Sequence, residues 1–405
     1  MQKKILLILS LILIITHRLP ACTTAIISGK YTLDGRPLLW KHRDSGSYEN
    51  KLMFFDDGKY SYIGLINSKD SLGLEIWAGS NSAGFSIINA ASYNLKQEET
   101  ELKDQEGLFM KQALQKCANL KDFERLLAET SGERGIEANF GVIDAFGGAA
   151  YYETDDTSYT KFDANDPKLA PFGYIIRTNY SFAGEIENGY GYIRFQTTDA
   201  LFYQAFAQQK LSYRFILQQA DRNLYHSLTK TDLKSLPYPF SKEEPQFVCM
   251  QDYINRFSSV SSTLVQGVKP GEAVAKTTIW TILGFQLCSV AIPTWVAAGE
   301  NLPSVLVAPG CKNAPLCQKA LKLKKQCFPI TRGSGKKYLN LSVLLNQQGD
   351  GVLQLLPMIE EKIIRKAEQN IKKWRKNGFN PKEAKSLYNW FDEVINEGYE
   401  KYFGL

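Results

Sequence analysis

The sequence predicts an α+β protein in which two antiparallel β-sheets are stacked between layers of helices, a four-layer αββα sandwich with a helical segment at its C-terminus. Three observations predict this fold. Segments rich in β-branched and aromatic residues occur in pairs around turn sequences, pairs of amphipathic helices interrupt them, and the 405 residues are 44% hydrophobic and 22% charged. Such a chain is long enough to bury a full core.

Three β-hairpins are expected in the first half of the chain. The first is "CTTAIISGKYTLDGRPLLWKHRDSG" (22–46), which folds back at the turn sequence Asp34-Gly35. Two more runs with the same pattern occupy residues 72–92 and 139–156. Successive hairpins make antiparallel sheets.

Helical spacing of apolar residues separates these strands. Two helices are expected within 105–130, and a second helical pair within 197–230. The core face of that second pair is predicted to be Leu201, Phe202, Phe206, Ile216, Leu217 and Leu224. Strand-like sequence returns at 258–268 and 277–299, and from Pro357 onward the chain is charged and helical. We therefore expect one main domain over 22–345 and a C-terminal helical extension over 346–405.

The N-terminus has the layout of an export signal. Lys3 and Lys4 precede an apolar run that is well short of the roughly 20 residues needed to span a bilayer. We predict that residues 1–21 form a signal peptide, which places the protein in the periplasm or outside the cell, with no transmembrane helix in the mature chain. Removing this segment lowers the formal charge from +6 to +3 because Lys3, Lys4 and Arg18 are lost.

This weak positive charge does not favour a nucleic-acid partner. Basic residues cluster at 312–325 and 362–382, but the second cluster alternates with Glu360, Glu361, Glu368 and apolar residues, which is typical of a solvated helix face. A small-molecule ligand is expected instead, and a homo-oligomer stays open.

The cysteines and histidines do not predict a metal site or a cofactor. Seven cysteines are present without CxxC spacing, and only His42 and His226 remain after the leader is removed. Export makes disulfides feasible, and a pair among Cys311, Cys317 and Cys327 is left open.

Cys22 is the strongest candidate for a reactive residue. A cysteine nucleophile ordinarily needs a histidine base, but His226 is expected in the middle of a helix and His42 is expected to point into a core. If Cys22 becomes the first residue of the mature chain, its own α-amino group, with an unperturbed pKa of about 7.7 to 8.0, can accept the thiol proton. The first hairpin brings a cation, Lys41 or Arg43, and the carboxylate of Asp44 opposite Cys22.

The same stretch resembles the cysteine N-terminal nucleophile (Ntn) hydrolases that include choloylglycine hydrolases, penicillin V acylases and the acyl-CoA:6-aminopenicillanic acid acyltransferase group. The resemblance covers about residues 22–300. It is carried by "CTTAIISGK…DGRPLLWKHRD", "GSNSAGFSIIN" (79–89), "IIRTNYS" (175–181), "YIRF" (192–195) and the segment 258–284.

The resemblance implies a set of site residues. Cys22 would be nucleophile and base, Asp44 would hold the amine, and Asn89 would donate to the oxyanion. Asn179 would contact the reacting centre, and a distal arginine would be Arg194 or, as second choice, Arg214. In the bile-salt and penicillin V enzymes an arginine stands three residues before the aspartate. Here Lys41 stands in that place and Arg43 precedes Asp44, which argues against bile-salt specificity.

Cys22 can also be read as a lipid-bearing anchor, because Leu19 and Ala21 fit a lipobox. Lipoprotein cysteines usually precede a polar tether, whereas Cys22 is followed directly by the apolar strand "TTAIIS". We therefore expect an exported hydrolase that cleaves a linear, non-peptide C–N amide bond through a thioester. The alternatives are an acyltransferase that passes the acyl group to an amine and a non-catalytic, lipid-anchored binding protein.

Overall fold

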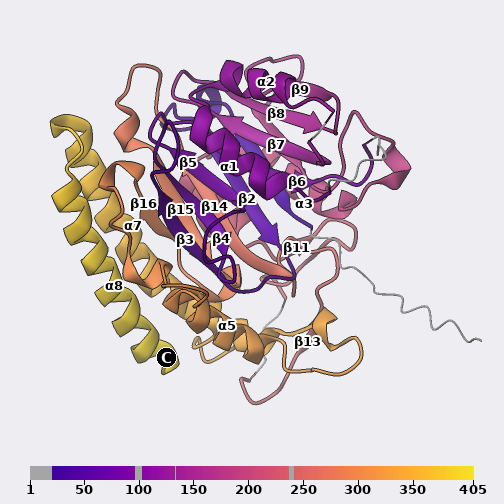
Figure 1. The fold of residues 1–405 in the computed structure, drawn as a ribbon. Coiled ribbons are helices and arrows are strands. Elements are labelled where there is room, and N and C mark those ends of the chain that lie inside the picture. Colours follow the sequence, from indigo (N-terminus) through magenta and orange to yellow (C-terminus); the bar gives the residue numbers. More distant parts are fainter. Residues whose placement is uncertain (1–20, 96–102, 133, 237–240) are drawn as a thin grey trace, which may run out of the picture.

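The computed structural model describes residues 21–95, 103–132, 134–236 and 241–405, and it contains two large antiparallel sheets (Figure 1). One sheet has six strands in the order β10 (Tyr174–Arg177), β1 (Thr23–Ile27), β2 (Leu38–Asp44), β14 (Ser259–Gln266), β15 (Thr278–Leu283) and β16 (Ile292–Thr294). The other has seven strands in sequence order: β3 (Asn50–Phe55), β4 (Tyr62–Asn67), β5 (Ala78–Asn81), β6 (Ser86–Ala91), β7 (Ala138–Ile143), β8 (Ala149–Thr154) and β9 (Tyr159–Asp163). Two short pairs complete the β-structure, β11 (Tyr225–His226) with β12 (Thr231–Asp232) and β13 (Phe247–Cys249) with β17 (Tyr338–Asn340).

Helices cover the outer faces of both sheets, so the predicted four-layer α+β fold is confirmed (Figure 1). The seven-stranded sheet is covered by α1 (Glu106–Lys116) and α2 (Leu120–Glu129). Against the six-stranded sheet lie α3 (Tyr192–Ala207), α5 (Pro315–Cys327) and α7 (Val352–Asn377), and α8 (Pro381–Phe403) packs on α7. The remaining helices, α4 (Tyr213–Phe215) and α6 (Leu341–Leu344), are short.

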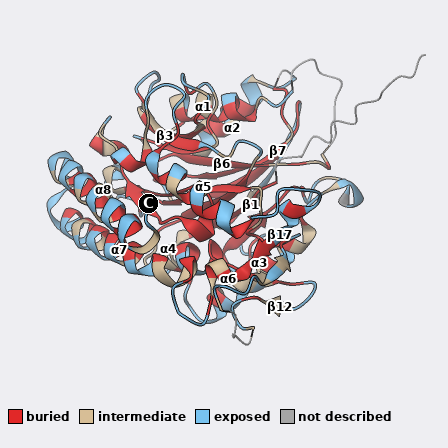
Figure 2. Ribbon diagram, turned by 90° about the horizontal axis from the view of Figure 1, so that it is seen from below, coloured by how far each residue is buried: buried red, intermediate tan, exposed pale blue. Residues whose placement is uncertain are grey.

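Two apolar cores hold these layers together. Rings from α1 and α2, including Phe109 and Phe123, pack with Phe140 and Tyr152 on the outer face of the seven-stranded sheet. The larger core fills the space between the sheets and extends to the C-terminal helices. Its strands are buried on both faces, whereas α7 and α8 bury one face and expose the other (Figure 2). Burial extends even to polar residues of the central strands, such as Lys41 and Arg43 on β2 and Ser262 on β14.

The first hairpin forms as predicted, with Thr23 paired to His42 and Ile27 paired to Leu38, so that Cys22 lies near residues 41–46. Its connection passes through a turn in which Gly35 adopts a φ of 72°, a conformation that glycine reaches without strain. The two other hairpins, β5–β6 and β7–β8, and the helices α1 and α2 also form where the sequence predicts them.

Three sequence expectations about helices are wrong. After α3, the second helix of the expected pair is only the short stretch formed by α4 and a π-turn over Ile216–Ala220. His226 is not in a helix but on β11, where it pairs with Thr231. The C-terminal helix begins at Val352, five residues before the expected start at Pro357, and Pro357 lies inside it, where it cannot donate the helical hydrogen bond to residue 353.

The C-terminal helices share the main core. Trp295, which follows β16, stacks on Tyr388 of α8 and meets Trp374 of α7 edge to face. The Tyr388 hydroxyl accepts a hydrogen bond from the Trp295 backbone N–H at 3.0 Å. The helices from residue 352 onward thus stabilise the six-stranded sheet directly.

The cysteines near α5 are unpaired in the structure, and Cys327 lies beside Cys288 rather than beside Cys311 or Cys317, with the two sulfurs 3.6 Å apart. In the described part of the chain no helix is both long and apolar enough to cross a bilayer. The predicted signal peptide falls almost entirely on residues 1–20, which lie outside the described residues.

Candidate active site

Cys22 lies immediately before β1, at the end of the six-stranded sheet where β2 finishes. The pairing of Thr23 with His42 places Cys22 next to the end of β2, and the Cys22 thiol lies 4.0 Å from the backbone carbonyl oxygen of Asp44. Only 6% of Cys22 is exposed. The hairpin therefore places the Cys22 sulfur close to residues 41–46, as the sequence predicted.

Asn179 and Arg194 contact Cys22 directly. The Cys22 backbone N–H donates to Asn179 Oδ1 at 2.9 Å, and Asn179 Nδ2 donates to the Ala91 carbonyl at 2.8 Å. Arg194, in the first turn of α3, donates from Nη1 to the Cys22 carbonyl at 2.5 Å and from Nη2 to Asn179 Oδ1 at 2.8 Å. Both side chains are fully buried, so they fix the position of the Cys22 backbone.

Arg214, the second choice for the distal arginine, lies elsewhere. Its guanidinium pairs with Glu361 and Glu368 on α7 at 2.9 and 2.8 Å, and 30% of its side chain is exposed. Its place after α3, on the outer face of the six-stranded sheet, keeps it away from the ends of β1 and β2.

Asp44 has different partners from the expected ones. Its carboxylate accepts from Ser259 Oγ at 2.7 Å and from Arg256 Nη2 at 2.5 Å, not from the Cys22 N–H. In the structure the Cys22 nitrogen is part of the Ala21–Cys22 peptide bond. It therefore has a single N–H group, and Asn179 Oδ1 accepts the hydrogen bond from it. Arg256 Nη2 also donates to the Ala21 carbonyl at 3.3 Å, so one guanidinium joins the Asp44 carboxylate to the residue before Cys22.

Lys41 and Asn89 form a pair that reaches from one sheet to the other. Lys41 Nζ donates to Asn89 Oδ1 at 2.5 Å and to the Trp77 carbonyl at 2.7 Å. The amide oxygen of Asn89 is thereby occupied, and no described residue accepts a hydrogen bond from its Nδ2. That amide N–H group is therefore available to a bound oxyanion.

Arg43 points to the same side of β2 as Lys41 but contacts β3 and β4. Its guanidinium donates to Asn50 Oδ1 at 2.5 Å and to Asn67 Oδ1 at 3.0 Å, and it lies 4.8 Å from the centre of the Trp77 ring. Neither Lys41 nor Arg43 donates to the thiol. Both act on Cys22 through their charge.

Burial shifts the pKa values of these cations. Desolvation lowers the pKa of Lys41 to about 8, of Arg43 to about 10 and of Arg194 to about 9, and negative charge on Cys22 opposes each shift. Three buried cations thus lie close enough to Cys22 to interact with a charge on its sulfur.

Sequence reasoning missed Arg256 and Ser259. Ser259 pairs with Asp44 across β14 and β2, and its hydroxyl also lies 3.0 Å from Nε2 of the fully buried His42. His42 Nδ1 in turn lies 3.5 Å from Asp221. His42 therefore contacts Ser259 and Asp221 and does not face Cys22. The alternation of side chains along β2 could have placed His42 and Asp44 on one face, but only the pairing with β14 reveals Ser259.

The site contains no arrangement suited to a metal ion. Among the described residues no group of three His, Cys, Asp or Glu side chains is close enough to bind one. His226 lies on β11, where its ring packs 4.9 Å from that of Tyr253.

Comparisons with known proteins give distant structural likenesses. No family model matches the chain, and no curated protein sequence matches it. The structure is similar to a variant of conjugated bile acid hydrolase from Clostridium perfringens, at 11% identity over 68% of this chain and 92% of that one, with a TM-score of 0.38. It is also similar to the Caenorhabditis elegans orthologue of N-acylethanolamine-hydrolyzing acid amidase (12% identity, 60% and 92% of the chains, TM-score 0.35). The penicillin V acylase of Agrobacterium tumefaciens matches at 10% identity, 68% and 86% coverage and a TM-score of 0.35.

Proposed function

We propose that the protein is an amidohydrolase that cleaves linear, non-peptide C–N bonds with Cys22 as an N-terminal nucleophile, after residues 1–21 have been removed. The observation that carries this proposal is the set of contacts around Cys22. Its backbone nitrogen, its carbonyl and its sulfur are each engaged or approached by a separate polar group, and three cations lie nearby. A cysteine with a purely structural role needs none of these groups.

In the proposed reaction the free α-amine accepts the thiol proton, and the thiolate attacks the amide carbonyl carbon. Asn89 Nδ2, with a backbone N–H, stabilises the tetrahedral oxyanion. The C–N bond then breaks, the departing amine takes the proton from the α-ammonium, and a thioester remains on Cys22. Water hydrolyses the thioester to release the acid.

The neighbouring residues have separate roles in this scheme. Asn179 and Arg194 position the Cys22 backbone, and Lys41 orients Asn89 so that its N–H group points to the substrate. Asp44, held by Arg256 and Ser259, lies beside the peptide bond that becomes the free amine, where a carboxylate stabilises an ammonium. The burial of Cys22 also supports a nucleophile over a lipid anchor, because a diacylglyceryl group on this sulfur would need space that the fold fills.

The proposal includes export. The N-terminal segment has the charge and length of a signal peptide, and its removal just before Cys22 would both release the protein outside the cytoplasm and create the amine. Cleavage of the Ala21–Cys22 peptide bond would then be required both for release of the exported protein and for catalysis.

The test is a turnover assay with protein that begins at Cys22. We expect it to hydrolyse at least one amide from a panel of N-acyl amino acids, acylated lactones, penicillins and bile-salt conjugates. Cys22→Ala should lose activity by about 10³-fold or more, because the thiol nucleophile is lost although the α-amine remains. Cys249→Ser, which changes an exposed cysteine, is the matched control and should retain full activity.

Two further measurements separate the alternatives. An added amine acceptor distinguishes transfer from hydrolysis by the ratio of the two products. Intact mass of protein from the native host distinguishes a free N-terminal cysteine from a lipidated one. Full turnover by the folded Cys22→Ala protein would contradict the proposal.

A further inference from the structure

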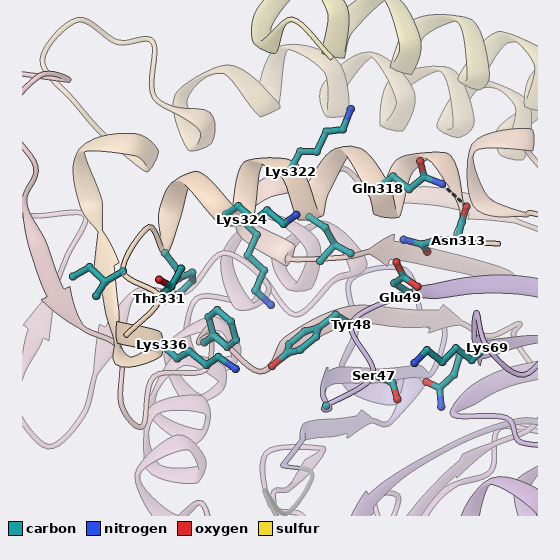
Figure 3. A pocket seen from close by; sticks show the side chains of 17 residues that line it. Ser47, Tyr48, Glu49, Lys69, Asn313, Gln318, Lys322, Lys324, Thr331 and Lys336 are labelled. Atoms are coloured by element: carbon teal, nitrogen blue, oxygen red, sulfur yellow. Dashed lines mark hydrogen bonds between the residues drawn. The ribbon is translucent and has the colours of Figure 1, made fainter. Parts of the chain in front are cut away.

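A cavity of about 790 Å³ lies beside the end of β2 that carries Asp44 (Figure 3). One wall is the segment 46–49, which directly follows β2, and another is formed by α5 and the residues after it, up to Lys336. This size is typical of small-molecule sites. Much of the wall comes from 313–336, beyond the part of the sequence that resembles the cysteine Ntn hydrolases.

The lining of this cavity is strongly basic. Of 17 lining residues, five are lysines and one, Glu49, is acidic. Lys69 and Lys336 lie on opposite sides with Lys324 between them, whereas Lys322 is directed away from the cavity (Figure 3). No described carboxylate pairs with any of the three inward lysines. The exposed ammonium groups of Lys69 and Lys336 present positive charge to this one cavity, and such charge attracts an anion.

The cavity also has an apolar side. Phe257, Phe328, Leu321 and Ile330 line it. Lys324 Nζ and Lys336 Nζ each lie 5.0 Å from the centre of the Phe257 ring, so charge and aromatic surface are presented together. A ligand that complements this lining carries an acidic group next to a hydrocarbon part.

Two contacts join the cavity to the candidate active site. Lys324 Nζ donates to the Ser259 carbonyl at 2.8 Å, and the Ser259 hydroxyl donates to Asp44. On the other side, Asn67 lines the cavity and accepts a hydrogen bond from Arg43. The cavity thus adjoins the residues around Cys22 at the same end of the sheet.

We propose that this cavity binds the charged part of the amide substrate, and that the substrate is therefore an amphiphilic organic anion. The inference rests on the proposed function for its link to catalysis, but the binding itself can be measured without turnover. Either a carboxylate or a phosphate-type group satisfies the chemistry of the lysines.

The test uses protein that begins at residue 22 and carries Cys22→Ala, so that amides bind without being cleaved. Calorimetric affinities are compared for N-octanoylglycine, N-octanoylaminomethylphosphonate and the neutral N-octanoylglycinamide. We expect at least one anion to bind about tenfold or more tightly than the neutral amide, with an affinity that falls as salt is added. The stronger of the two anions identifies the acidic group.

Variants locate the binding to the cavity. Lys69→Ala combined with Lys336→Ala should remove most of the preference for the anion and leave binding of the neutral amide unchanged. Lys322→Ala, on α5 and directed away from the cavity, should behave like the parent. Equal affinity for the charged and neutral amides, or a preference that survives the double substitution, overturns the inference. Anion binding without turnover of any amide by the Cys22 protein instead overturns the proposed function.

Discussion

Two buried carboxylate–arginine pairs serve the molecule in different ways. Glu153 on β8 pairs with Arg177 on β10 at 2.6 Å, and their side chains are 0% and 2% exposed. Asp44 on β2 pairs with Arg256 at 2.5 Å, with exposures of 1% and 11%. The chemistry is the same, but the surroundings differ.

Glu153 is satisfied by backbone and side chain together. Besides Arg177, its oxygens accept from the backbone N–H groups of Phe182 and Ala183 at 2.9 and 2.7 Å. The Arg177 guanidinium lies 4.0 Å from the Phe182 ring centre, so the pair is enclosed by the chain that it holds. This arrangement fixes the loop after β10, which contains Asn179.

The hydrogen-bond partners of the Asp44 carboxylate are both side chains, those of Arg256 and Ser259. Arg256 is partly exposed and also donates to the Ala21 carbonyl. A carboxylate held in this way can change partners when the Ala21–Cys22 bond is cut. The comparison teaches that the first pair stabilises the fold and that the second is available for chemistry.

Asp44→Asn tests the second half of this comparison and should have the largest effect. We expect amide cleavage by the processed protein to fall by about 10²-fold or more, because the neutral amide no longer stabilises the α-ammonium. The rate of Cys22 alkylation, followed by peptide mass mapping, gives a second readout that needs no substrate. Asp350→Asn, at an exposed pair with Lys242, is the control and should leave both rates unchanged.

Glu153→Gln tests the first half. We expect the free energy of unfolding to fall by about 3–5 kcal/mol, since Arg177 is left as a buried, unpaired charge. Urea denaturation of this variant and of Asp44→Asn measures the difference. Asp44→Asn should lose less, because Arg256 is partly hydrated, and a larger loss there would reverse our assignment of the two pairs. Arg365→Ala, at a surface pair, should change stability by no more than about 0.5 kcal/mol.

Lys324 sharpens the comparison through pH and should give the smallest effect. Burial lowers its pKa to about 7 from an ordinary 10.5, against the opposing charges of Asp44 and the thiols of Cys288, Cys317 and Cys327. Between these two values the unfolded chain binds the extra proton, so stability should rise with pH in this window, by at most about 1.4 kcal/mol per pH unit. Lys324→Met should flatten the rise between pH 7 and 8.5 in urea titrations. An unchanged slope in the variant would show that Lys324 does not titrate in this range.

The sequence predicted the hairpins and the first two helices because their signals are local. Turn residues such as Asp34-Gly35 and the alternation of apolar residues do not depend on distant parts of the chain. The short helix after α3 and the strand at His226 were mispredicted, because apolar spacing over a few residues fits a helix and a buried turn equally well. The start of the C-terminal helix was also misjudged, because a proline favours a helix start, whereas Pro357 lies inside a helix that begins at Val352.

The candidate nucleophile, the fold class and the approach of Cys22 to residues 41–44 were all predictable from the sequence, because the position of a hairpin turn decides which residues face each other. The packing of the layers fixes which arginine contacts Cys22, how Arg256 and Ser259 hold Asp44, and how Lys69, Lys324 and Lys336 come to line one cavity. The contacts of Cys22, Asp44 and Lys324 join residues 65 to 215 positions apart, so they depend on how the layers pack and not on any local pattern.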